Sequence, residues 1–199
     1  MPKRIALLLV MPLVLAAAPA PATKPSTPAK PTELAIDDGL PAGKKSIAGS
    51  GHAIVLDAPA GGGGALTAVK IFGSRYGTQQ PPAEDFHVWL CDADGKQLKE
   101  FKFPYKLFLR GDPRWVTLKL PESANLPATG KFILCVGFNP QQTKGVYVHY
   151  DKSPDGDNRT GLPGQLNDAF GQGDWMIRAI VSPKSLNQNE PQMNTDERG

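Results

Sequence analysis

The sequence predicts an all-β fold, a single β-sandwich with a jelly-roll-like arrangement of about eight antiparallel strands. Gly (21 residues) and Pro (20 residues) together make up about a fifth of the 199 residues, which disfavours long helices. In the middle of the chain, short segments of alternating apolar and polar residues are separated by turn signals such as Asp94-Gly95 and Asn139-Pro140. An immunoglobulin-like sandwich is the competing architecture, because it is built from the same kind of strand.

Residues 1–22 have the pattern of a bacterial secretory signal peptide. Lys3 and Arg4 precede an apolar run, and small residues follow it, so we expect cleavage after Ala22. The apolar run is shorter than the roughly 20 residues that a membrane-spanning helix needs. We therefore expect an exported protein, periplasmic or extracellular, with no membrane span.

The rest of the chain divides into three regions by composition. Residues 23–32 alternate Pro with small polar residues, which predicts an extended linker. Residues 183–199 are polar and nearly free of large apolar side chains, which predicts a disordered tail. Residues 33–182 form the β-sandwich domain, and their number suffices for one hydrophobic core.

The strands of this domain are predicted from their alternation and from the turns between them. Phe101 and Phe103, for example, flank Lys102, so the two aromatic side chains point to one face of a strand. The eight predicted strands are His52–Ala58, Leu66–Phe72, Asp85–Cys91, Gln97–Phe103, Arg114–Leu120, Lys131–Phe138, Gly145–Asp151 and Asp174–Val181.

Charge and motifs exclude several classes of function. The chain has 22 basic and 19 acidic residues, and the domain itself carries equal numbers of each, so no electrostatic attraction to nucleic acid is expected. The sequence contains no Gly-x-Ser-x-Gly elbow, no His-Glu-x-x-His and no phosphate-binding loop. We therefore expect a protein that is not an enzyme.

Four stretches share one layout with a known group of proteins. They are Asp37-Asp38-Gly39, Gly51-His52-Ala53, the strand and turn from Phe86 to Asp94, and Asp174-Trp175-Met176-Ile177-Arg178-Ala179. In these stretches the chain resembles the extracellular, jelly-roll-like β-sandwich modules of secreted bacterial proteins, which often accompany hydrolase domains. The resemblance implies an extracytoplasmic β-sandwich without a defined catalytic activity of its own.

His87 and Trp89 are the candidate ligand-binding residues. Phe86, Val88 and Leu90 share one face of their strand, so His87 and Trp89 lie on the other. On an exposed face these two rings are suited to stacking on a sugar, as in carbohydrate-binding β-sandwiches. The alternative is that a loop covers this face and that Trp89 only packs. The same alternatives apply to Tyr105, Trp115 and Tyr147.

Carboxylates suggest two candidate calcium sites. Related sandwiches often close their ends with a structural ion, and Asp37 and Asp38 before the first strand, with Asp174 at the last, offer oxygen ligands for calcium. Aspartate also stabilises turns through its own backbone, which is the alternative. A second candidate is the acidic loop from Asp151 to Asn158, and zinc would require His52, His87 and His149 to converge. No other cofactor is expected.

Cys91 and Cys135 are the only two cysteines, and we expect them to form a disulfide. In a jelly roll the third and sixth strands are antiparallel neighbours, and each cysteine lies opposite to the apolar face of its strand. Export also places the chain where disulfides persist. The alternative is that both are free and act as small apolar side chains.

The sequence is compatible with three functions. We expect a non-catalytic module that binds a carbohydrate or a cell-envelope polymer, which requires exposed aromatic side chains on one sheet. A structural or surface-protein-binding module requires an apolar patch or a free edge strand. A secreted hydrolase requires convergent carboxylates or a Ser/His pair in a pocket.

Overall fold

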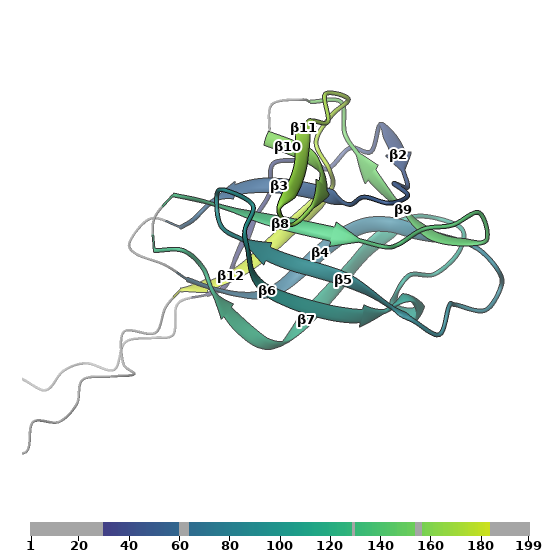
Figure 1. The fold of residues 1–199 in the computed structure, drawn as a ribbon, viewed down its shortest axis with the longest axis horizontal. Coiled ribbons are helices and arrows are strands. Elements are labelled where there is room, and N and C mark those ends of the chain that lie inside the picture. Colours follow the sequence, from purple (N-terminus) through teal and green to yellow (C-terminus); the bar gives the residue numbers. More distant parts are fainter. Residues whose placement is uncertain (1–29, 60–63, 129, 154–156, 184–199) are drawn as a thin grey trace, which may run out of the picture.

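Two antiparallel sheets pack face to face and form a β-sandwich (Figure 1). The computed structural model describes residues 30–59, 64–128, 130–153 and 157–183. The predicted all-β class is thereby confirmed, with twelve strands in place of eight. Within the described ranges no helix is long and apolar enough to cross a membrane. The expected signal peptide, most of the linker and nearly all of the expected tail lie outside these ranges.

The first sheet, sheet A, is organised around one long strand. That strand pairs with β7 along one edge, and with β12 and then β9 along the other. The remaining strands, β1 and β2, extend the sheet beyond β12 and β9. In the order of the sheet the strands are β1 (Thr32–Leu34), β12 (Ile177–Pro183), β4 (Gly64–Gly77), β9 (Lys144–Tyr150) and β2 (Gly43–Lys45), with β7 (Arg114–Asn125) beside β4.

The second sheet, sheet B, is a simple ladder of six strands. Their order is β11 (Gln165–Ala169), β10 (Asp157–Leu162), β3 (His52–Asp57), β8 (Lys131–Gly137), β5 (Asp85–Cys91) and β6 (Gln97–Pro104). The third and sixth predicted strands, β5 and β8, are antiparallel neighbours, as predicted.

Each of the eight predicted segments contains a strand, and four further strands were not predicted. Strands β1 and β2 have three residues each, and Leu34 is their only large apolar residue, so no alternation can be recognised in them. Strands β10 and β11 are rich in Asp, Asn and Gly, which are typical of turns. They form an edge hairpin because β10 pairs with β3, a contact between segments more than 100 residues apart.

The main core lies between the two sheets and is dominated by aromatic side chains. Phe86 packs against Phe138, Phe108 and Tyr105, with ring centroids between 4.7 and 5.8 Å apart. All four side chains are almost completely buried. Truncating one such ring to alanine typically costs about 3–5 kcal/mol, so this cluster is a principal source of stability.

A smaller core covers part of the outer face of sheet B. It consists of five residues from three adjacent strands: Ala53, Val55, Cys91, Ile133 and Cys135. Trp89 and Leu166 of β11 pack against these five residues. Strand β8 is therefore buried on both faces. This double burial explains why its sequence is a continuous apolar run with no alternation.

Candidate functional site

The structure places His87 and Trp89 together on the outer face of sheet B. Both belong to β5, and their rings stack with centroids 5.3 Å apart and an angle of 13° between their planes. His87 Nδ1 lies 2.5 Å from Oε1 of Glu100 on the neighbouring strand β6. This contact fixes the imidazole orientation and leaves Nε2 available for another partner.

These two side chains open onto a hollow of about 310 Å³. The hollow is lined by Gly49, Ser50, His87, Trp89, Gly137, Asn139 and Leu162. Gly137 is required for this arrangement, because a Cβ atom there would lie only 2.8 Å from the six-membered ring of Trp89. Because Gly137 has no side chain, the indole of Trp89 can lie across β8.

Asn139 contributes the most unusual backbone conformation of the site. Among the described residues it is the only one other than glycine with a positive φ, of 42°. Asparagine tolerates this left-handed region better than most residues, but the conformation is still costly. The turn that follows β8 holds Asn139 there, and the residue is exposed at the rim of the hollow.

The hollow therefore combines an aromatic surface with polar groups that can both donate and accept hydrogen bonds. Trp89 provides the apolar surface, while His87, Ser50 and Asn139 provide an imidazole, a hydroxyl and an amide. Both alternatives left open for Trp89 are realised in part. One portion of the indole packs against the smaller core beside Leu166, and another portion lines the hollow.

The three aspartates predicted to bind calcium do not share one site. Asp37 binds Arg178, which donates from Nε to Oδ2 at 2.9 Å and from Nη2 to Oδ1 at 2.5 Å. Asp38 Oδ1 instead accepts a hydrogen bond from the backbone N–H of Leu40. Asp174 is buried and accepts a hydrogen bond from the Asn158 side-chain amide.

The segments that carry these aspartates do meet, but around a different carboxylate. The buried side chain of Asp151 accepts three backbone N–H groups, from Asp38 at 2.7 Å, Asp174 at 2.8 Å and Ser153 at 3.1 Å. Asp151 is thus a structural link between distant segments. In the part of the chain that the structure describes, no group of three or more His, Cys, Asp or Glu side chains is arranged to hold a metal ion.

The three histidines also lie in separate environments. His52 is buried in the main core beside Trp175, with ring centroids 4.6 Å apart, and burial lowers its pKa to about 4. His149 packs against Phe72 on the outer face of sheet A. His87 lies on sheet B, so the histidines do not form the zinc site considered from the sequence.

Both cysteines are free thiols in the structure, and both are buried in the smaller core. The predicted strand pairing is present, but the register differs from the direct opposition that the expected disulfide assumed. Cys135 lies opposite Trp89, and Cys91 lies opposite Ile133. The two thiols are therefore diagonal neighbours on one face, a less favourable arrangement for a disulfide than a directly opposed pair.

Sequence reasoning missed a second group of aromatic side chains, on the outer face of sheet A. Five residues of β4, β7 and β9 form it, and all are partly exposed: Phe72, Tyr76, Trp115, Tyr147 and His149. Trp115 and Tyr147 were singled out as aromatic residues without a known location, whereas Tyr105 belongs to the main core. The alternation within β4, with Phe72, Ser74 and Tyr76 on one face, was the available signal.

No protein-family model matches the chain, and no curated protein has a significantly similar sequence.

Proposed function

We propose that this protein is an exported, non-catalytic module that binds a carbohydrate of the cell envelope in the hollow beside Trp89. The observation that supports the proposal is the combination of Trp89 with His87, Ser50 and Asn139 around one small cavity. The leader-like pattern of residues 1–22 supports the expectation that such a ligand is met outside the cytoplasm.

The chemistry of the hollow suits a sugar residue. The C–H groups on one face of a sugar ring pack against an aromatic surface, and its hydroxyls both donate and accept hydrogen bonds. Trp89 supplies the aromatic surface, and the Asn139 amide and the Ser50 hydroxyl supply hydrogen-bonding partners. A volume of about 310 Å³ is at the lower end of ligand pockets, so we propose that one sugar residue occupies it.

One observation favours a second function, that of a secreted hydrolase. Ser50 and His87 line the same hollow, and His87 is oriented by Glu100, as the base of a Ser-His-carboxylate triad would be. Among the described residues, however, no hydrogen bond joins Ser50 to His87. A sugar-binding role needs only that the two groups face the ligand, and it therefore remains our preferred proposal.

The test is binding of the purified protein to soluble polysaccharides, measured by affinity electrophoresis and by the change in tryptophan fluorescence. Neutral probes such as xylan and mixed-linkage β-glucan are compared with polygalacturonate. We expect Trp89→Ala and Asn139→Gly each to weaken binding of a neutral probe at least tenfold. Asn139→Gly removes the amide and at the same time relieves the backbone cost at φ 42°, so its effect is not explained by unfolding.

Two outcomes would overturn the proposal. The first is that no polysaccharide binds, and the second is that binding is unchanged in both variants. Release of reducing sugar or of p-nitrophenol from an ester, abolished in both Ser50→Ala and His87→Ala, would establish the hydrolase instead. The matched control is Ser123→Ala, because Ser123 is exposed on β7 of the other sheet.

A further inference from the structure

We infer a second binding surface, on the outer face of sheet A, for a polysaccharide that carries carboxylate groups. The cationic aromatic face consists of five partly exposed rings and the cationic side chains among them: Phe72, Tyr76, Trp115, Tyr147, His149, Lys44, Lys70, Lys119 and Arg178. It lies on the opposite sheet from the hollow beside Trp89, and the inference does not depend on that hollow.

Strand register arranges the rings in a row. Trp115 of β7 lies opposite Phe72 of β4, with ring centroids 5.4 Å apart, and Phe72 packs against His149 of β9 at 5.2 Å. Tyr147 is two residues before His149 and therefore on the same face of β9. Tyr147 in turn packs against Tyr76 of β4 at 4.5 Å, so the row returns to β4 and continues along that strand.

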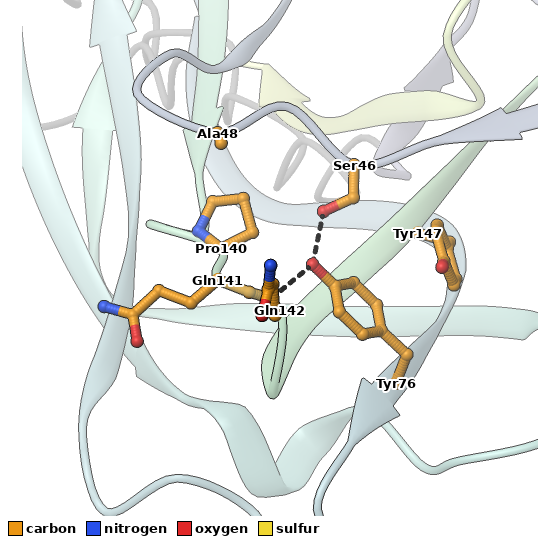
Figure 2. Close-up of a pocket in the computed structure, with 7 residues that line it drawn as sticks. All are labelled: Ser46, Ala48, Tyr76, Pro140, Gln141, Gln142 and Tyr147. Atoms are coloured by element: carbon orange, nitrogen blue, oxygen red, sulfur yellow. Dashed lines mark hydrogen bonds between the residues drawn. The ribbon is translucent and has the colours of Figure 1, made fainter.

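The row ends at a hollow of about 440 Å³ that has no charged side chain in its lining (Figure 2). It is formed by Ser46, Ala48, Tyr76, Pro140, Gln141, Gln142 and Tyr147. The Tyr76 hydroxyl donates to the Gln141 carbonyl at 3.0 Å and lies 3.3 Å from the Ser46 hydroxyl (Figure 2). Packing and hydrogen bonds thus hold these rings in place before a ligand arrives, which reduces the entropic cost of binding.

The charge of this face differs from that of the whole domain. Its four cationic side chains outnumber the two carboxylates that contact them, Glu33 and Asp37. The two carboxylates pair with Lys70 and Arg178, which lie over the ring of Trp115. The face therefore has an excess of positive charge although the domain as a whole is balanced.

Lys44 is the cation best placed to meet a ligand. Its ammonium group lies 4.9 Å from the centre of the Tyr147 ring, next to the end of the row, and it pairs with no carboxylate among the described residues. Burial and the nearby charge of Lys44 lower the pKa of His149, so Lys44 carries the local positive charge at neutral pH. A uronic acid combines the two features that this position recognises, a sugar ring and a carboxylate.

The experiment measures binding of the full-length protein to polygalacturonate at low and at high salt, with xylan as the neutral polymer. We expect polygalacturonate to bind more tightly than xylan on this face and to lose affinity as salt is added. Lys44→Ala and Tyr147→Ala should each weaken polygalacturonate binding at least tenfold. Lys106→Ala should leave it unchanged, because Lys106 is exposed in the 3₁₀ turn Tyr105–Leu107 and does not belong to the cationic aromatic face.

The outcomes separate this inference from the proposed function. If Asn139→Gly lost polygalacturonate binding and Lys44→Ala kept it, the polymer would bind in the hollow on sheet B and the inference would be overturned. Equal binding of xylan, or an equal effect of Lys44→Ala and Lys106→Ala, would overturn it as well. Tighter binding of single-stranded oligodeoxythymidine than of polygalacturonate would assign the face to nucleic acid, which also uses aromatic rings and cations.

Discussion

Trp89 lies directly opposite Cys135 in the ladder between β5 and β8, so the two thiols of the protein are diagonal neighbours. The indole occupies the position across from Cys135 that a disulfide partner would need. A shift of two residues in register thus separates the observed arrangement from the one expected from strand order and phase alone.

We expect both thiols to be reduced in the purified protein. The two thiols are buried, diagonal neighbours rather than a directly opposed pair, and this arrangement is unfavourable for a disulfide. Alkylation under denaturing conditions without reductant should therefore add two groups, as counted by mass spectrometry. Alkylation of the native protein should add none, since both side chains are buried. A mass corresponding to no added group after denaturation would show that the disulfide forms despite the diagonal register.

Stability should fall as the pH is lowered from 7 to 4, in part because of His52. Burial lowers the pKa of His52 to about 4 in the folded protein, while the unfolded chain has the ordinary value of 6.5. Between these values the unfolded state binds more protons, so the stability present above pH 6.5 is lost as the pH falls. The contribution of this residue is roughly 3 kcal/mol, from about 1.4 kcal/mol per unit of pKa difference.

The measurement is the free energy of unfolding in urea at several pH values, for the wild type and for His52→Gln. The variant cannot become charged at this position, so the difference between the two proteins should shrink steadily from pH 7 to pH 4. His87→Gln is the control, because His87 is partly exposed on the outer face of sheet B. A difference that stays constant over this range would show that His52 is protonated equally in both states.

Replacing Asp151 by Asn should destabilise the fold by about 2–3 kcal/mol. The carboxylate accepts hydrogen bonds from three backbone N–H groups. In asparagine one of the two oxygens is replaced by an NH₂ group, which is a donor and cannot accept from the N–H group that faces it. Chemical denaturation measures the loss, with Asp112→Asn as an exposed control. If the two variants were equally stable, Asp151 would not link the segments in the way described.

Calcium should leave the melting temperature unchanged. Asp37 is neutralised by Arg178, and the Asp151 carboxylate is occupied by backbone amides, so an ion would have to displace existing contacts. Thermal unfolding followed with excess calcium and with excess EDTA makes the comparison. A melting temperature that rises with calcium concentration would indicate a site formed by other residues.

Arg178→Ala should cost about 3 kcal/mol, because the side chain of Asp37 is fully buried beside it. Without the guanidinium, the Asp37 carboxylate loses both of its charged hydrogen bonds. In the double variant with Asp37→Ala the loss should be smaller than the sum of the two single losses. Strict additivity would mean that the pair does not interact, and Arg114→Ala serves as the exposed control.

Much of the fold was predictable because strand alternation is a local property. In β5, the burial of Phe86, Val88 and Leu90 and the outward position of His87 and Trp89 follow from the two-residue period alone. The hollow beside Trp89 was not predictable, because Asn139 and Ser50 reach it from loops that are distant in sequence. The sequence thus predicted His87 and Trp89 as candidate residues, but it did not predict that Asn139 and Ser50 lie beside them.

The sequence by itself determined the all-β class, the positions of eight strands and the face on which each side chain of β5 lies. The tertiary structure decided the register of β5 on β8, the pairing of β10 with β3, and the choice of Asp151 as the carboxylate that holds Asp38 and Asp174. The physical reason is the range of the interactions. Alternation depends on neighbours two residues apart, whereas Asp38 and Asp151 are 113 residues apart and meet only when the strands of sheet A that flank them, β1, β2 and β9, have assembled.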